Sequence, residues 1–190
     1  MDRREAIKRT AIIMGGFAFA PSALGVLKGC TPQPGIEWNP QFFNNSQARL
    51  VSILTDIIIP SGETPGAADV GVPAFIEEMV STIYDDEARE KFVSGLEAFN
   101  NVFKEQNGSD YADLDHDQQF QFAAVQNKLA IDSEHTQQPE TEFFFIMKEL
   151  TMLGYFTSEP GATETLRYIQ APGRYDGCVP FEEIGRAWAR

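Results

Sequence analysis

Large apolar side chains recur along residues 87–107 at the spacing of one helical face. They are separated by four, three and four positions: Phe92, Leu96, Phe99 and Phe103. This spacing places all four on one side of an α-helix, and a face of that size has to be buried against other elements. Asn107-Gly108 then supplies a helix stop. The pattern predicts a long amphipathic helix that packs inside a helical domain.

Four further segments carry apolar residues at helical spacing: residues 46–59, 73–83, 116–129 and 140–153. Asn45 or Ser46 can cap the first and Asp115 the third. Apolar residues cover most of the circumference of the fourth, which predicts central burial or burial under a partner subunit. A short helix is expected over 163–169, and the Pro/Gly-rich stretches 60–72 and 170–180 are expected to be loops. The predicted fold is mainly α, a single helical domain of about five to six helices with long ordered Gly/Pro-rich loops.

The N-terminal segment has the order of an export signal. Arg3, Arg4 and Lys8 precede an apolar run from Ala11 to Ala20 that Pro21 ends. The paired arginines resemble a twin-arginine signal, although Ala6 stands where that motif usually has Phe; this route exports proteins already folded. A membrane-spanning anchor or an amphipathic helix is the alternative, but the run is too short to cross a hydrocarbon core of about 30 Å. Residues 1–29 are therefore assigned to the signal.

Cys30 follows the signal directly and has two interpretations. Leu27-Lys28-Gly29-Cys30 resembles a lipoprotein processing site. Processing there would make a lipidated Cys30 the new N-terminus, and its acyl chains would anchor the exported protein to a membrane in the periplasm or cell envelope. A disulfide with Cys178 is the other interpretation, because disulfides persist outside the cytoplasm. Residues 30–45 read as a tether and residues 46–190 as the helical domain.

The charge of the exported chain excludes some partners. Residues 30–190 contain 10 basic and 26 acidic residues, a net charge of −16. Such a surface repels nucleic acid and anionic lipid headgroups. Proteins or neutral molecules are the expected partners, with membrane contact made through the lipid anchor.

The sequence contains no recognised motif for a bound cofactor or a hydrolytic site. It lacks Gly-x-Gly-x-x-Gly, a Walker motif, Cys-x-x-Cys-His, Gly-x-Ser-x-Gly and His-Glu-x-x-His. An acidic cluster could be read as a metal site but fits the start of a helix better: Asp110, Asp113, Asp115, His116 and Asp117. His135 lies in a polar connection, and the pairs Glu77-Glu78 and Asp85-Asp86 are expected on solvated faces. No catalytic, cofactor or metal residue is predicted.

Two segments resemble the gluconate 2-dehydrogenase small subunit (subunit 3) family. In residues 58–76 the likeness lies in Pro60, Pro65-Gly66-Ala67 and Gly71-Val72-Pro73 before a helix. The second segment runs from Leu150 to Glu159 and continues to residues 172–180. With the twin-arginine start, the resemblance covers most of the chain in the same order.

The resemblance implies that this chain binds a catalytic partner and catalyses no reaction itself. Members of this family accompany a large FAD-containing subunit of the glucose-methanol-choline type that oxidises a sugar, sugar acid or polyol, often with a cytochrome subunit. The small subunit would aid folding, co-export and assembly without catalytic residues of its own. Partner-interface candidates in the two loop regions are Pro65, Gly66, Tyr155, Phe156, Tyr168, Pro172, Gly173 and Tyr175; the same residues could instead set turns and cover the domain's own core. A stand-alone envelope lipoprotein that binds or scaffolds other molecules is the alternative function.

Overall fold

The computed structural model of the chain describes residues 38–131, 138–171, 173 and 177–189. All of them belong to one compact unit, Ile36–Arg190. The predicted export signal and Cys30 lie outside the described residues. The predicted mainly α-helical domain is confirmed, since the only β pairing in the described part of the chain is one isolated bridge, between Arg167 and Trp188.

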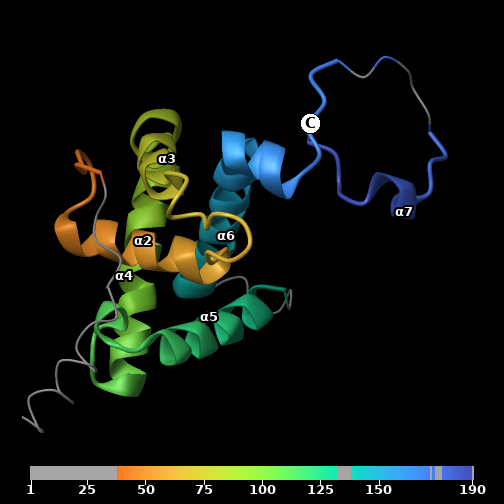
Figure 1. Cartoon of the computed structure of the whole chain (residues 1–190). Helices are drawn as coiled ribbons and strands as arrows, with labels where there is room; N and C mark the ends of the chain where they lie inside the picture. Colours follow the sequence, from red (N-terminus) through yellow and green to blue (C-terminus); the bar gives the residue numbers. More distant parts are fainter. Residues whose placement is uncertain (1–37, 132–137, 172, 174–176, 190) are drawn as a thin grey trace, which may run out of the picture. The chain divides into compact units, whose positions relative to one another are not determined.

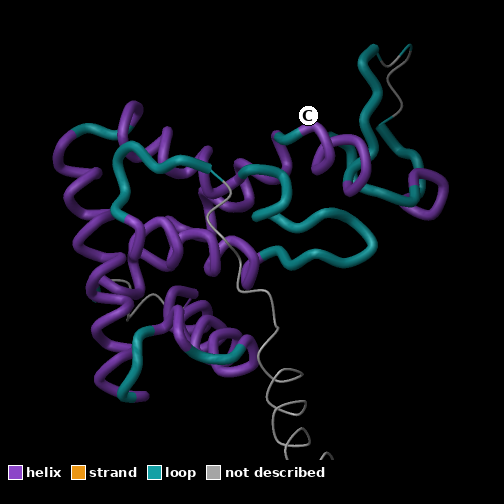
Figure 2. Tube along the Cα trace, turned by 60° about the vertical axis from the view of Figure 1, so that its left-hand side comes forward, coloured by secondary structure: helices purple, strands orange, loops and turns teal. Residues whose placement is uncertain are grey.

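The elements follow one another along the chain in the order shown in Figure 1. The α-helices are α2 (Asn45–Ile58), α3 (Val72–Glu78), α4 (Asp86–Asn107), α5 (His116–Ile131), α6 (Pro139–Thr157) and α7 (Phe181–Ile184). A π-helical turn, η1 (Met79–Ile83), extends α3, and a second one, η3 (Gly161–Thr165), follows α6. A 3₁₀ turn, η2 (Tyr111–Asp113), precedes α5. Figure 2 shows these helices joined by loops, among them the long loop of residues 59–71 between α2 and α3.

The helix boundaries lie close to the predicted ones and differ for local reasons. The cap of α2 is Asn44, one residue before the first predicted candidate, because Asn44 and Gln47 satisfy each other's backbone N–H groups as a capping box. Asp115 caps α5 as predicted, accepting from the backbone N–H of Gln118 at 3.0 Å. Asp85, the first residue of an acidic pair expected on a solvated face, caps α4 by accepting from Ala88.

α6 is the central helix of the domain. It packs most extensively against α4 and also contacts α2, α3, α5 and η3. The predicted face of α4 meets it there: Phe92 and Phe99 are fully buried, and their rings lie 5.1 and 5.8 Å from that of Phe143 in edge-on arrangements. Aromatic pairs in this geometry add to the free energy gained by burying their area. The side of α6 turned away from these helices leaves Phe145, Met152 and Leu153 exposed.

α5 buries a different face from the one its apolar residues suggest. Phe120 and Val125 are more than half exposed, whereas Gln119 and Gln126 are buried. Gln119 can be buried because it exchanges hydrogen bonds with Tyr111. The side-chain amide of Gln119 donates to the backbone carbonyl oxygen of Tyr111 at 2.9 Å, and the Tyr111 hydroxyl donates to the backbone carbonyl oxygen of Gln119 at 2.8 Å. Burial also raises the pKa of Tyr111. A satisfied polar pair thus takes a place in the core that periodicity alone would give to an apolar side chain.

The helix expected over residues 163–169 is wrong beyond Thr165. η3 ends there, and Leu166 is extended. The backbone N–H of Arg167 then donates to the carbonyl of Ala187 at 2.8 Å, and Ala189 N–H donates back to Arg167 at 3.0 Å. A pairing twenty residues away therefore takes the hydrogen bonds that a continuing helix would have used.

Gly95 permits the close approach of α4 and α6, so Gly95→Ala is expected to destabilise the domain. A β-carbon at this position would lie 2.6 Å from the Phe143 β-carbon and 3.0 Å from the Pro139 carbonyl oxygen. Relieving such overpacking costs about 1–3 kcal/mol. Urea unfolding followed by circular dichroism measures the change. Gly62→Ala is the matched control, because a β-carbon there meets nothing within 4 Å; equal stabilities for the two variants would contradict the prediction.

Candidate functional site

The acidic cluster of residues 110–117 holds the start of α5 and the end of α4 in place. Asp110 accepts from the Asn100 side chain at 3.0 Å, and Asp113 pairs with Arg49 at 3.1 Å. Asp115 is the α5 cap. Nowhere in residues 38–131, 138–171, 173 and 177–189 do three His, Cys, Asp or Glu side chains come together as a metal site. The cluster therefore caps α5 and ties the turn before it to α2 and α4.

Glu77 anchors the segment that leads into the domain. Its carboxylate accepts four hydrogen bonds, from the Trp38 indole at 2.7 Å and from three successive backbone N–H groups: Gln41 at 3.0 Å, Phe42 at 2.7 Å and Phe43 at 2.9 Å. Burial by itself would raise the pKa of Glu77. The hydrogen bonds from the backbone N–H groups of Phe43 and Phe42 and from the Trp38 indole together lower it by more, so the pKa of the carboxyl is held below its usual range. Residues 38–44, assigned to the tether, are thus bound to α3.

The expectation that Glu77 lies on a solvated face is wrong. Glu77 is 7% exposed, whereas its neighbour Glu78 is exposed as expected. Adjacent helical residues point in different directions, and here one of the two points at the entering chain. The aromatic residues Trp38, Phe42 and Phe43 were the available signal, because they mark a segment that packs before α2 begins.

The two candidate interface loops meet at the hydroxyl of Tyr155. Tyr155 lies in α6 and is 1% exposed. Its hydroxyl donates to the Pro65 carbonyl oxygen at 2.9 Å and shares a hydrogen bond of 2.7 Å with the Thr165 hydroxyl in η3. The Thr64 hydroxyl oxygen lies 3.3 Å from the Tyr155 hydroxyl oxygen. One side chain therefore joins the loop after α2 to the turn after α6.

The loop of residues 59–71 is also organised from within. Asp69 accepts from the Ser61 hydroxyl and, at 2.8 Å, from the Gly66 backbone N–H. Ala67 N–H donates to the Ile59 carbonyl oxygen at 2.9 Å. A β-carbon on Gly66 would lie 2.6 Å from the Ser61 nitrogen, so the turn needs glycine at this position.

The predicted interface residues occupy very different positions. Gly66 and Tyr155 are buried, Pro65 and Phe156 are half-buried, and Tyr168 and Gly173 are exposed, while Pro172 and Tyr175 lie outside the described residues. Tyr155 and Gly66 contribute to the domain's own core and turns, as the second alternative has it. A role in partner binding stays a prediction for all the interface candidates.

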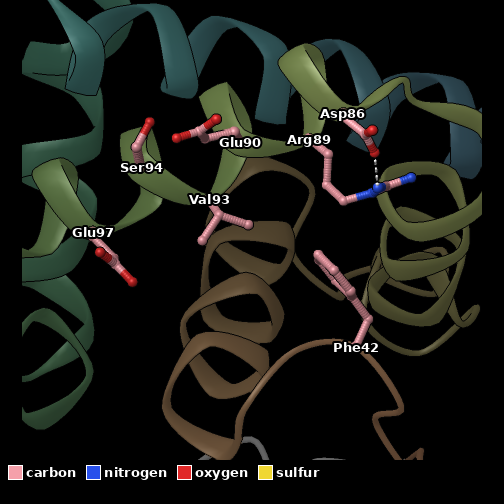
Figure 3. Close-up of a pocket in the computed structure, with 7 residues that line it drawn as sticks. All are labelled: Phe42, Asp86, Arg89, Glu90, Val93, Ser94 and Glu97. Atoms are coloured by element: carbon pink, nitrogen blue, oxygen red, sulfur yellow. Dashed lines mark hydrogen bonds and ion pairs between the residues drawn. The ribbon is translucent and has the colours of Figure 1, made fainter.

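An open acidic hollow of about 420 Å³ runs along α4. Its lining residues are drawn in Figure 3: Phe42, Asp86, Arg89, Glu90, Val93, Ser94 and Glu97. Arg89 pairs with Asp86 at 2.7 Å and also donates to the carbonyl oxygens of Val80, Ser81 and Tyr84. Since its guanidinium is engaged in closing η1, the carboxylates of Glu90 and Glu97 dominate the rim.

Asp56 is a half-buried carboxyl that sequence reasoning did not single out. Burial raises its pKa and nearby Asp69 adds to the rise, while His116 opposes it. The charged groups that shift its pKa lie in the loop of residues 59–71 and in α5, so no spacing in the sequence marked the position. One carboxyl beside one imidazole matches none of the motifs sought and is assigned no reaction.

Most of the exposed large apolar side chains in the described residues fall into three groups, and Phe42 and Ile83 are exposed outside them. α5 exposes Phe120, Val125 and Ile131, and α6 exposes Phe145, Met152 and Leu153. The third group follows η3: Tyr168, Ile169, Phe181 and Trp188. Where such side chains adjoin one another on the surface, they can serve as a protein–protein contact. None of the helices in the described part of the chain combines the length and apolarity needed to cross a membrane.

A model of the family described as gluconate 2-dehydrogenase subunit 3 matches residues 45–173, which is more than half of the chain. The chain belongs to this family. The match begins with α2 and includes both loops that Tyr155 joins, so the features that hold these loops together lie within the family region. As a member of this family, the chain is an accessory subunit of the gluconate 2-dehydrogenase subunit 3 type. Neither the curated proteins nor the solved structures contain a match to it.

Glu77→Gln is expected to weaken the attachment of residues 38–44. An amide cannot accept from all four donors, and each buried donor left unpaired costs about 1–3 kcal/mol. Because the folded pKa of Glu77 is lowered, its contribution is present above the unfolded pKa and is lost as pH falls below about 4.3. Urea unfolding of both proteins at neutral pH and at about pH 3 should show a difference that shrinks in acid.

Glu78→Gln is the control for this prediction, since Glu78 is the exposed neighbour on the same helix. It should match the wild-type protein at both pH values. A Glu77→Gln deficit of the same size in acid as at neutral pH would contradict the ionised clamp.

Proposed function

We propose that this chain is the non-catalytic small subunit of a membrane-associated FAD-dependent dehydrogenase that oxidises a sugar, a sugar acid or a polyol. The observation that carries the proposal is the family match across residues 45–173. FAD and the catalytic residues belong to a large subunit of the glucose-methanol-choline type, and a cytochrome subunit can complete the complex. No residue of this chain is assigned to FAD.

The small subunit aids folding, assembly and export of the large one. A flavoprotein acquires FAD when it folds, so a complex of the two folded subunits needs a route that carries folded proteins, and a twin-arginine signal provides that route. Arg3, Arg4 and Lys8 form this signal. Exposed apolar groups on α5, α6 and the C-terminal segment support the proposal, because an assembly subunit needs surface for a partner.

Lipidated Cys30 holds the complex at a membrane of the periplasm or envelope. The acidic surface of the exported chain does not attract anionic headgroups. Acyl chains bind membranes through buried methylene groups and need no charge attraction, and two or more chains anchor a protein stably.

An affinity purification of the tagged chain from solubilised native membranes tests the proposal. The expected result is a copurified oxidoreductase with a flavin absorption spectrum, identified by mass spectrometry. A colourless chain recovered alone would contradict the subunit function and favour a stand-alone lipoprotein.

Arg3-Arg4→Lys-Lys is expected to leave both subunits in the cytoplasm. The twin-arginine route reads the arginine pair, and the large subunit depends on the signal of this chain. Cell fractionation followed by immunodetection of each subunit measures the effect. Arg9→Lys is the matched control, because it changes an arginine outside the pair; normal export of the large subunit in the paired variant would contradict shared transport.

Cys30→Ser is expected to release the chain from the membrane, since the acyl chains are then lost. Cys178→Ser is the matched control, because Cys178 is the other cysteine of the chain and is exposed. Under the lipid-anchor proposal only Cys30→Ser changes fractionation. Equal changes in mobility of the two variants on non-reducing gels would instead indicate a disulfide between the two cysteines.

A further inference from the structure

Residues 38–44, here called the entry segment, are held against the domain although they form no helix or strand. Figure 1 shows them directly before α2. Phe43 is 4% exposed, and its ring stacks 6.0 Å from that of Phe92 in α4. Asn44 caps α2. The end of the entry segment is thus fixed by apolar packing and by the helix that follows.

The rest of the entry segment is held by one carboxylate. Three successive backbone N–H groups converge on Oε1 of Glu77, at 3.0 Å from Gln41, 2.7 Å from Phe42 and 2.9 Å from Phe43. The Trp38 indole donates to the other carboxylate oxygen at 2.7 Å. Successive backbone N–H groups gathered in this way form a concave site for an anion. Glu77 of α3 is the anion that fills it.

A neutral amide at position 77 cannot satisfy the same donors. Glutamine has one acceptor oxygen, and its nitrogen only donates. With that oxygen toward the three backbone N–H groups, the amide nitrogen would face the Trp38 indole, which is itself a donor. The attachment of the entry segment therefore depends on the ionised carboxylate.

The place where the chain is bound to the domain limits how far a lipid anchor can lie from it. In the proposed lipoprotein the acyl chains are carried by Cys30, and Trp38 is already bound to Glu77. An extended chain advances at most about 3.6 Å per residue, so Trp38 lies within about 29 Å of Cys30 in any conformation. If the chain were bound only from Asn45 onward, the limit would be about 54 Å.

The shorter limit suits an acidic protein at a membrane surface. Residues 30–190 carry a net charge of −16, which anionic headgroups repel. Salt screens this repulsion over a Debye length of about 8 Å at physiological ionic strength. A reach of about 29 Å clears that layer. A reach nearly twice as long would let the assembled subunits move away from a redox partner held in the membrane.

We propose that Glu77 determines how close the anchored domain lies to the membrane, because by binding the entry segment it limits the tether to residues 31–37. This inference rests on the proposed lipid anchor at Cys30. Glu77 acts as a positioning residue and contacts neither lipid nor substrate. The family match begins at residue 45, so Glu77 lies inside the matched region and the segment that it binds lies outside.

Chymotrypsin can report whether the entry segment is bound, because it cuts after large apolar residues. Residues 31–37 contain no aromatic residue, whereas the entry segment contains three: Trp38, Phe42 and Phe43. The lipidated full-length chain is purified in detergent and reconstituted in vesicles. Release of the intact domain then requires a cut in the entry segment, and mass spectrometry identifies it by fragments that begin within residues 39–44.

Glu77→Gln is expected to release these fragments at least tenfold faster than the wild-type chain. Cleavage follows the population of the open form when opening and closing are fast, and tenfold corresponds to about 1.4 kcal/mol. Glu78→Gln is the matched control, since Glu78 is the exposed neighbour, and it should keep the wild-type rate. Trp38→Phe removes only the indole donor and keeps an aromatic cleavage site, so the rate should rise severalfold. It decides the question if Glu77→Gln unfolds the whole domain.

Energy transfer from a fluorophore on Cys178 to a dye in the vesicle membrane measures the distance itself. Cys178 is exposed and carries the remaining thiol once Cys30 is acylated. Glu77→Gln should lower the transfer efficiency. A flexible Gly/Ser spacer of about seven residues inserted after Gly35 should lower it as well. The spacer variant should keep the wild-type rate of chymotrypsin release, because its entry segment stays bound.

Two results would overturn the inference. Equal release rates for Glu77→Gln and Glu78→Gln, or a wild-type rate for Trp38→Phe when Glu77→Gln unfolds, show that Glu77 does not hold the entry segment. Faster release with unchanged energy transfer, while the spacer lowers the transfer, shows that the entry segment does not set the distance. A wild-type chain that does not remain with the vesicles rejects the lipid anchor itself. In that case the same fragments, measured in solution, still show whether Glu77 binds the entry segment.

Discussion

The close approach of α4 and α6 at Gly95 is the constraint on which the rest of the domain depends. With only a hydrogen at this position, Phe143 and the Pro139 carbonyl can lie against the α4 backbone. The aromatic faces of the two helices then meet at ring distances of 5–6 Å. Because α6 also contacts α2, α3, α5 and η3, the depth of this one contact sets where the other helices can pack.

Polar contacts then fix the parts that periodicity leaves undetermined. Glu77 gathers three successive backbone N–H groups and an indole, which orders a segment without regular structure before α2. Tyr155 does the same for the loop after α2 and the turn after α6, which meet at its hydroxyl. In both cases a buried polar group is satisfied by partners far away in the chain, as burial requires. These contacts hold the entering segment and the loop after α2 against the helices.

The helices could be predicted from the sequence because their signals are local. Apolar spacing and capping residues lie within one or two turns of each other, so α4 and the Asp115 cap were found correctly. The Glu77 and Tyr155 contacts could not be predicted, since their partners lie 34 to 39 and 90 positions away. The extension of a helix to Ile169 was wrong for the same reason, because the Arg167 backbone pairs with Ala187. On α5, a hydrogen-bonded glutamine took the core position that an apolar residue was expected to fill.

The Tyr155 contact also imposes an order in time. Pro65 leaves the ribosome early, but the hydroxyl that holds its carbonyl oxygen, and the Thr165 hydroxyl beside it, are synthesised much later. Contacts between residues so far apart form only after both have emerged and the intervening chain has closed. The loop of residues 59–71 can therefore reach its final form only when α6 and η3 are in place. Its shape therefore depends on a part of the chain that is synthesised 90 residues after Pro65.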